Sequence, residues 1–178
     1  MLEFSHYWFA IAVIWLQVIT LDLLLVFFHI GGTKWWDVFI FQFLRQWGLW
    51  LGFLVAFTAM FAAQWYEAMG FLPCYLCWWG RIFLYPQIVL FGIAAWRRDA
   101  NIALYSIALS VLGAGVSFYH HALQMGWITS SPCVAEGGVD CAARTFFEFD
   151  YITFPLMSFS VFAFLIVLML FQIRRDAS

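Results

Sequence analysis

Apolar side chains dominate five stretches of the chain, and charged, glycine or proline residues bound each stretch. A helix needs about 20 apolar residues to cross the hydrocarbon core of a bilayer. The stretches that approach this length are Tyr7 to Phe28, Gly48 to Trp65, Ile82 to Trp96, Ile102 to Leu123 and Phe154 to Ile173. The third is the shortest, and it is long enough only if its helix begins near Pro73. The pattern predicts an all-α membrane protein with five transmembrane helices.

A polar and aromatic segment, Trp35 to Trp47, lies between the first two apolar stretches. Aromatic rings mixed with Asp37 and Arg45 favour a helix that lies flat at the membrane interface, and a connecting loop is the alternative. Asp22 lies deep in the first apolar stretch, where a carboxylate in lipid is costly. It is a functional candidate, although contact with another helix or a tilted span is the simpler interpretation.

Composition agrees with a lipid environment, since 66% of the residues are hydrophobic and 10% are charged, against roughly 45–50% and about 25% in soluble domains. A net charge of −2 without a basic cluster argues against nucleic acid as a partner. No linker or internal repeat divides the chain, which indicates one domain. We expect the first stretch to be a retained helix rather than a signal peptide, because Glu3 and no basic residue precedes it.

Basic residues are distributed unequally between the two sides of the membrane that five helices define. Six fall on one side and two on the other, namely Lys34, Arg45, Arg97, Arg98, Arg174 and Arg175 against Arg81 and Arg144. The positive-inside rule makes the first side cytoplasmic. The loops with all four cysteines are therefore predicted to be extracytoplasmic, where thiol oxidation is normal, and the C-terminus is predicted to be cytoplasmic.

Cys74 and Cys77 stand where an extracytoplasmic loop enters the third helix. Pro73 is expected at the first helical position, where its missing N–H would have had no partner in any case. The two cysteines would then share the first turn and one face, with Arg81 one turn further on. The positive end of the helix dipole and the nearby cation favour a thiolate. A thiol with a lowered pKa forms a reversible disulfide, so this pair is predicted to be redox-active.

Two alternatives to a redox-active pair stay open. One is a structural disulfide or a pair of core cysteines, although a two-residue loop closes too little chain to stabilise the fold much. The second is a zinc site made by all four cysteines. The wider spacing of the second pair, in a loop where oxidation competes with metal binding, weakens the zinc interpretation.

The second pair, Cys133 and Cys141, lies in a loop with Pro132, Gly137 and Gly138. The loop is long and flexible enough for the two cysteines to bridge each other, and we expect their disulfide to be accessible to a thiolate of another protein. A simple loop staple is the alternative. Two pairs on the same membrane face also permit electrons to pass from the loop pair to the helix pair by successive thiol–disulfide exchange.

An electron relay needs a final acceptor, and Trp78, Trp79 and Phe83 surround the helix pair at the membrane boundary. A quinone accepts two electrons and dissolves in this layer, so these rings are candidates to hold it. His120 and His121, near the extracytoplasmic end of the fourth helix, are candidates to give a proton or a hydrogen bond to a quinone oxygen. Lipid anchoring by each tryptophan and ordinary interfacial histidines are the alternatives.

Several motifs follow one another in a specific order along the chain. They are Pro73-Cys74-Tyr75-Leu76-Cys77 with Arg81, Tyr119-His120-His121-Ala122-Leu123-Gln124, Pro132-Cys133, Asp140-Cys141-Ala142-Ala143-Arg144 and Ile152-Thr153-Phe154-Pro155-Leu156. Together they resemble the disulfide bond formation protein B family of membrane oxidases (DsbB, with its BdbC relatives). The resemblance implies a four-helix transmembrane bundle over residues 48–175. Residues 1–32 are then an additional N-terminal transmembrane helix, and residues 33–47 a cytoplasmic interfacial segment.

The resemblance implies a disulfide-generating thiol:quinone oxidoreductase of the bacterial cytoplasmic (inner) membrane. Its cofactor would be ubiquinone or menaquinone, and its partner a DsbA/BdbD-like thiol oxidase of the thioredoxin fold. By motif position, Cys77 engages the quinone, Cys74 is its redox partner and Arg81 stabilises the charged intermediate. Cys133 forms the mixed disulfide with the partner protein, and Cys141 resolves it or completes the loop disulfide.

The chain also departs from the family pattern. The first helix is extra, Gly80 stands where an acidic residue often precedes the arginine, and the loop cysteines are closer together than in the best-known form. Two rival functions remain open. A vitamin K epoxide reductase-like quinone reductase would use the same type of dithiol, and a non-enzymatic membrane protein would carry structural disulfides or a metal.

Overall fold

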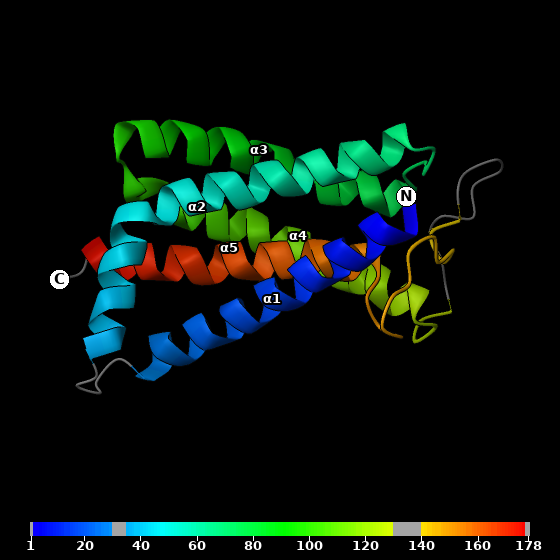
Figure 1. The fold of residues 1–178 in the computed structure, drawn as a ribbon. Coiled ribbons are helices and arrows are strands. Elements are labelled where there is room, and N and C mark those ends of the chain that lie inside the picture. Colours follow the sequence, from blue (N-terminus) through cyan, green and yellow to red (C-terminus); the bar gives the residue numbers. More distant parts are fainter. Residues whose placement is uncertain (1, 30–34, 130–139, 177–178) are drawn as a thin grey trace.

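The computed structural model describes residues 2–29, 35–129 and 140–176. Its long helices are α1 (Leu2–His29), α2 (Trp35–Ala68), α3 (Tyr75–Arg97), α4 (Ala103–Gln124) and α5 (Phe154–Asp176), and the 3-10 helix η1 (Ala100–Ile102) joins α3 to α4. Figure 1 shows that they form a helical bundle, with no strand in these described ranges. Five helices are long and apolar enough to cross a membrane, which confirms the predicted all-α membrane fold.

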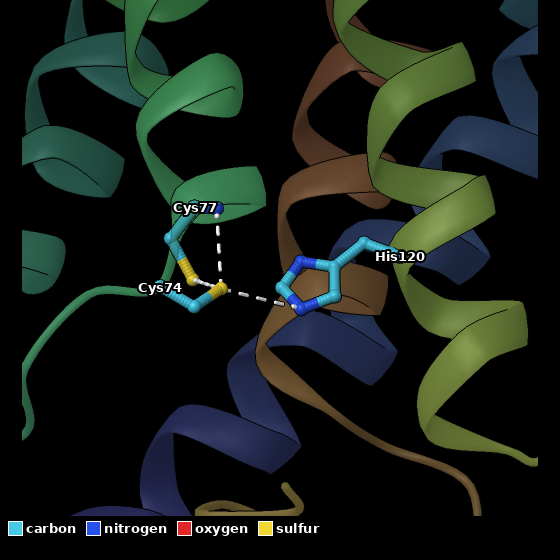
Figure 2. A group of neighbouring side chains, drawn as sticks. All are labelled: Cys74, Cys77 and His120. Atoms are coloured by element: carbon cyan, nitrogen blue, oxygen red, sulfur yellow. Dashed lines mark hydrogen bonds between the residues drawn. The ribbon is translucent and has the colours of Figure 1, made fainter. Parts of the chain in front are cut away.

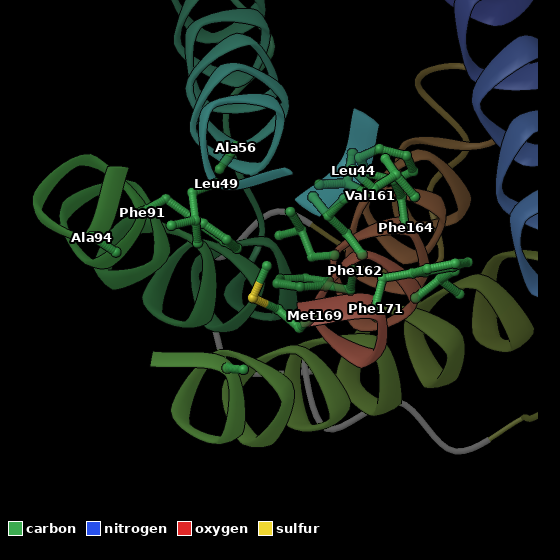
Figure 3. Close-up of a cluster of buried hydrophobic side chains, with 14 of the residues drawn as sticks. Leu44, Leu49, Ala56, Phe91, Ala94, Val161, Phe162, Phe164, Met169 and Phe171 are labelled. Carbon is green, nitrogen blue, oxygen red and sulfur yellow. The ribbon is translucent and has the colours of Figure 1, made fainter. Parts of the chain in front are cut away.

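Helix α5 is the best-buried helix of the bundle, and α1 crosses the outside obliquely (Figure 1). The protein buries 56% of the most apolar part of α5 but only 11% of that of α1. Phe162 and Met169 of α5 form part of the main hydrophobic core with Phe91 of α3 and Leu49 of α2 (Figure 3). Lipid rather than protein therefore covers most of α1.

Helices α2 and α3 approach each other closely in the half of the bundle away from the cysteines. A Cβ atom at Gly52 would lie 2.5 Å from the ring of Phe91, and Phe91 is fully buried. Small residues at such contacts let membrane helices pack with their backbones close together. Gly52 therefore permits the short distance between α2 and α3.

Neutral polar side chains join the helices inside the membrane layer. Gln87 of α3 donates hydrogen bonds to the backbone oxygen of Ser106 (3.1 Å) and the hydroxyl of Ser110 (2.6 Å), and it accepts one from the Ser106 hydroxyl (2.7 Å). Gln172 of α5 donates to the backbone oxygen of Leu44 in α2 (2.7 Å). Interhelical hydrogen bonds of this kind stabilise membrane bundles by about 0.6 kcal/mol each on average.

The turn between α2 and α3 determines where the third helix begins. Gly70 has a φ of +97°, and the Phe71 N–H donates to the backbone oxygen of Tyr66 (3.1 Å), which closes the last turn of α2. A glycine with positive φ just after a helix is a common way to end it. The chain then passes Pro73 without regular structure and enters α3 at Tyr75, so the Cys74 backbone lies at the helix tip.

Two expectations about the helices change. The second helix begins at Trp35 rather than at Gly48, because the aromatic segment continues as helix into the apolar stretch. Figure 1 shows the first turns of α2 at a steep angle to the rest of the helix, while their position at the cytoplasmic interface stays a prediction. Asp22 is exposed on α1 rather than packed against a described helix, and the alternative of a tilted span agrees with the oblique course of α1.

Candidate active site

Cys74 is the N-cap residue of α3. Its backbone is extended (φ −76°, ψ 173°), and its sulfur accepts a hydrogen bond from the Cys77 N–H at 3.4 Å. Serine, threonine and aspartate usually satisfy the first N–H groups of a helix in this way. The prediction that Pro73 occupies the first helical position is therefore wrong, because the thiol caps the helix and the helix begins after it.

The two sulfurs of the helix pair are in direct contact. Both are free thiols, and the Cys74 and Cys77 Sγ atoms are 2.9 Å apart (Figure 2). The hydrogen bond from the Cys77 side chain lowers the pKa of Cys74 to about 4, the bond and charge of His120 also lower it, and burial opposes them. Cys74 is therefore the thiolate of the reduced pair at neutral pH, with the Cys77 S–H as its donor.

His120 of α4 joins the helix pair to the segment that contains Cys141. Its Nε2 atom lies 3.6 Å from the Cys74 sulfur and 3.1 Å from the Cys141 backbone oxygen. Cys141 packs in one buried cluster with Cys74, Leu76 and Leu123. The first cysteine of the helix pair and a cysteine of the loop pair therefore meet around one histidine.

The loop pair differs from the sequence prediction in its accessibility. Cys141 is disulfide-bonded, but only 1% of its surface is exposed, so the expectation of an accessible disulfide is wrong for this residue. The position of Cys141 under the end of α4 explains the burial. Cys133 and the glycines of the loop lie outside the described residues.

Side-chain contacts with the end of α4 hold the segment around Cys141 in place. The Gln124 amide donates to the Ala143 oxygen (3.1 Å), and Arg144 Nε donates to the Gln124 backbone oxygen (2.5 Å). The Arg144 guanidinium also lies 4.9 Å from the centre of the Phe147 ring. Gln124 and Arg144 belong to two separate sequence motifs, and the sequence does not reveal that they fasten one motif to the other.

A cavity of about 420 Å³ lies beside Cys77. All five long helices contribute to its wall, and Cys77, Arg81 and His120 give it a polar end. The other walls are mostly apolar, and Cys74 does not line the cavity. Small-molecule sites typically have volumes of roughly 300–1,000 Å³, apolar walls and a few convergent polar groups. The two sulfurs therefore face different surroundings: Cys77 faces the cavity, and Cys74 faces His120 and the Cys141 segment.

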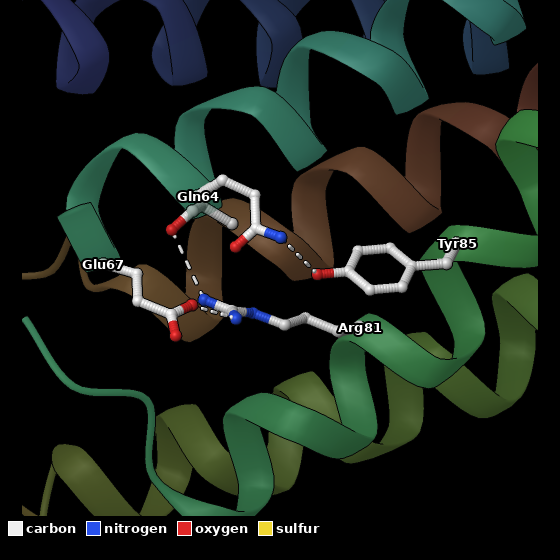
Figure 4. A network of polar contacts seen from close by, with 5 residues as sticks. Gln64, Glu67, Arg81 and Tyr85 are labelled. Atoms are coloured by element: carbon white, nitrogen blue, oxygen red, sulfur yellow. Dashed lines mark hydrogen bonds and ion pairs between the residues drawn. The ribbon is translucent and has the colours of Figure 1, made fainter.

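Arg81 is held at the cavity by α2 (Figure 4). It donates to the Glu67 carboxylate (2.5 Å) and to the Ala63 backbone oxygen (3.3 Å), and its guanidinium lies 5.2 Å from the Trp78 ring centre. These hydrogen bonds use two of its five N–H donors. Sequence reasoning missed Glu67, and the signal that could have found it is an acidic residue at the end of an apolar stretch. Arg81 is preceded by Gly80 rather than by an acidic residue, and Glu67 on α2 is its acidic partner instead.

Four residues predicted to contact a quinone do not line the cavity, namely Trp78, Trp79, Phe83 and His121. The His121 Nδ1 atom is 2.8 Å from the Thr153 hydroxyl, and that hydroxyl accepts a hydrogen bond from the Leu156 N–H in the first turn of α5. Trp78 is half-exposed and contacts Arg81 from outside the lining. His121 thus supports the start of α5, and Trp78 supports the arginine.

A metal ion is the other occupant that the described residues could hold here. The donor atoms of Cys74, Cys77 and His120 all lie within 4.8 Å of one another. Cys141 is disulfide-bonded and so offers no thiolate, which contradicts the four-cysteine zinc site considered from the sequence. Only three donor atoms come together among the described residues, and an apolar cavity lies beside them. This arrangement favours a redox-active pair over a zinc site.

Comparisons with known proteins match the part of the chain that carries this site. The family model described as "Disulfide bond formation protein DsbB" matches residues 45–172. A "Probable disulfide formation protein C" of Halalkalibacterium halodurans is 34% identical over 68% of this chain and 90% of the relative. The "Disulfide bond formation protein C" of Bacillus subtilis is 32% identical over 68% and 88% of the two chains. The "SPbeta prophage-derived disulfide bond formation protein B" of the same species is 37% identical over 68% and 82%. No solved structure matches the chain.

Proposed function

The chain belongs to the disulfide bond formation protein DsbB family, and from this premise we propose that it oxidises an extracytoplasmic thioredoxin-fold partner and passes the electrons to a quinone. Membership of the family implies an oxidoreductase that forms disulfides. One observation supports the finer proposal most. Sulfur atoms 2.9 Å apart face two different sides, with Cys74 toward the Cys141 segment and Cys77 toward an apolar cavity.

The first step is exchange with a DsbA/BdbD-like partner. A thiolate of the partner attacks the Cys133 sulfur, breaks the Cys133–Cys141 bond and releases the Cys141 thiolate. The second thiol of the partner then attacks the mixed disulfide, so the partner leaves oxidised by two electrons and the loop pair is left as a dithiol. The burial of Cys141 supports attack at Cys133, because an incoming protein cannot reach the buried sulfur.

The second step transfers the same two electrons to the helix pair. The Cys141 thiolate attacks Cys74, breaks the Cys74–Cys77 bond and releases Cys77 as a thiolate. Cys133 then attacks Cys141 in the mixed Cys74–Cys141 disulfide, which restores the loop disulfide and releases Cys74 as a thiolate. The packing of Cys141 with Cys74 supports this route. His120 Nε2, 3.6 Å from the Cys74 sulfur, stabilises the released thiolate, and this lowers the barrier to the exchange.

The cavity beside Cys77 fits a quinone, since its walls are mostly apolar and its polar end contains a cation and a histidine. A bound ubiquinone or menaquinone would accept two electrons and two protons. Arg81, kept in place by Glu67, holds positive charge where negative charge develops. Cys74 lies ready to close the disulfide on Cys77 as the electrons leave. The unequal distribution of basic residues supports an extracytoplasmic position for this site in a bacterial cytoplasmic membrane.

The decisive experiment measures quinone reduction by the purified full chain with candidate thioredoxin-fold donors. We expect Cys77→Ser to lower the rate of quinone reduction by at least about 1,000-fold, because the sulfur that faces the cavity is lost. Cys133→Ser should block reduction by the protein partner while a small dithiol still drives quinone reduction. Turnover of the Cys77 variant at the parent rate contradicts the proposal. Faster reduction of a quinone epoxide than of a quinone would instead favour the vitamin K epoxide reductase-like function.

A further inference from the structure

Helix α1 lies outside the matched family region, which begins at residue 45, yet it forms one wall of the cavity. Phe9, Ala12, Val13 and Leu16 of α1 all line it. Their spacing along the chain puts them on one face of the helix. The extra helix is therefore part of the candidate site and not only an additional membrane anchor.

The α1 wall extends from the level of the cysteines into the membrane. At the end of this wall nearest the cysteines, the Phe9 ring lies 5.5 Å from the ring of Tyr66 at the end of α2. Leu16 lies about two helical turns further along α1, which is about 10 Å at 1.5 Å per residue. Leu84, also in the lining, lies about two turns beyond Cys77 in α3 in the same way. The cavity therefore runs about 10 Å inward from the thiol pair.

The deep part of the cavity, about two turns from the thiols, is mostly apolar, because the lining serines Ser117 and Ser158 lie only about one turn inward from His120 and Phe154. The α1 residues are hydrocarbon, and the Thr58 hydroxyl of α2 already donates to the Leu54 and Val55 backbone oxygens at 2.8 and 3.1 Å. A quinone ring needs polar groups at its oxygens, and those groups lie at the Cys77 end. The deep part suits a hydrocarbon chain instead, because transfer of apolar surface from water favours contact with such walls.

We propose that α1 binds the hydrocarbon tail of the quinone and so makes the enzyme selective for tailed quinones, an inference that rests on the function proposed above. Helix α1 packs mainly against α5, and Gln17 is tied to Ser160 there by a 2.8 Å hydrogen bond. Ala12 and Thr58 line the cavity from α1 and α2, and both stay exposed. The tail therefore leaves the cavity toward the lipid between α1 and α2.

Photolabelling tests the contact without relying on turnover. The probe is a benzoquinone with a diazirine on a ten-carbon tail, added to the full chain in lipid nanodiscs and followed by mass spectrometry. We expect labelling on α1 between Phe9 and Leu16, competed by a decyl quinone of the same ring. Labelling confined to α3, α4 and α5 overturns the proposal, because the tail then avoids α1.

A matched pair of α1 substitutions tests selectivity. Val13→Phe adds a ring inside the cavity, and Val18→Phe adds the same ring on the exposed face of α1. We expect Val13→Phe to raise KM for the decyl quinone at least fivefold, with KM for the tailless quinone and the kcat changed less than twofold. Val18→Phe should change neither. Single-turnover reduction of Cys74–Cys77 by the partner shows that each variant is folded.

The outcomes separate this inference from the proposed function. Equal changes for the tailed and tailless quinones overturn tail binding by α1, and so does a Val13→Phe enzyme that behaves like the parent, since a lipid chain or nothing then fills the deep cavity. In both cases the parent enzyme still reduces quinone, and the proposed function stands. A parent enzyme that reduces neither quinone contradicts the proposed function and this inference together.

Discussion

The two halves of the bundle use polar and small residues in opposite ways. Around Gln87 and Gly52, far from the cysteines, the buried hydrogen bonds of the described side chains join neutral groups, and α2 packs closely on α3. Around Cys77 and Arg81 the helices enclose a cavity, and the Arg81 guanidinium, paired with Glu67, lines it. A membrane protein tolerates charge and empty space only where a ligand, water or an ion pair compensates for them. The difference assigns stability to the first half and chemistry to the second.

Among the changes that test this division between the two halves, removal of the cavity charge should have the largest effect. We expect Arg81→Gln to lower kcat/KM for quinone about 100-fold, which is about 2.7 kcal/mol of transition-state stabilisation. Reduction of the Cys74–Cys77 disulfide by the partner releases the Cys77 thiolate beside Arg81, so it should also slow in a single turnover, but by much less than quinone reduction does. Steady-state kinetics with a varied quinone measures the first quantity. An Arg81→Gln enzyme with the parent kcat/KM would show that the charge serves the fold alone.

The same glycine substitution in the two halves should give opposite results. Gly52→Ala places a Cβ against the Phe91 ring, whereas a Cβ at Gly80 on the cavity meets nothing within 4 Å. Overpacking of a filled core costs about 1–3 kcal/mol, while Gly→Ala in open space favours a helix by up to about 1 kcal/mol. We expect Gly52→Ala to lower the unfolding temperature in detergent and Gly80→Ala to raise it slightly. Equal shifts would mean that the two halves are packed alike.

The contact of His120 with Cys74, which links the two cysteine pairs, can be tested by the pH dependence of Cys74 alkylation. Cys74 has a pKa of about 4, so it is a thiolate above that pH and its alkylation rate should be flat from about pH 5 to 8. His120→Ala removes a hydrogen bond and a positive charge that favour the thiolate, so the pKa of Cys74 rises. We expect alkylation at pH 5 to fall by about twofold or more and to recover at higher pH.

The measurement is iodoacetamide labelling of the reduced protein, with the modified cysteine identified by mass spectrometry. His121→Ala is the matched control, because that ring contacts Thr153 and not the thiols. It should leave the pH profile of Cys74 unchanged. A flat profile in the His120 variant would show that the Cys77 hydrogen bond alone keeps Cys74 ionised.

Local patterns carried the prediction of the fold further than the prediction of the site. Length and hydropathy located all five membrane helices, because the bilayer sets both. They missed the start of α2 at Trp35, since charged and aromatic residues in a helix at an angle to the others look like a loop in a hydropathy pattern. They also missed that Cys74 is the N-cap of α3 instead of lying inside its first turn, because cysteine is an uncommon N-cap residue.

Contacts between distant segments were beyond the sequence. The three-residue spacing of Cys74 and Cys77 was enough to expect neighbouring sulfurs. The pairing of Glu67 with Arg81 and the contact of His120 with Cys74 join residues on different helices, and one sequence contains no distance between helices. The face of α1 in the cavity was equally hidden, because any apolar helix can be covered by lipid or by protein.

The smallest effect is expected in the neutral half, from Gln87→Leu. The change removes three hydrogen bonds between α3 and α4, but the freed Ser106 and Ser110 hydroxyls can bond to backbone oxygens of their own helix. We expect the free energy of unfolding to fall by about 1 kcal/mol, with quinone kinetics within twofold of the parent. Unfolding in a denaturing detergent measures the change in free energy.

Gln87→Glu tests the neutrality of this half from the other direction. A carboxylate at this fully buried position has no cation beside it among the described residues, so it should destabilise the bundle more than leucine does. If Gln87→Leu instead impaired quinone reduction as much as Arg81→Gln, the division between a stabilising half and a chemical half would be wrong.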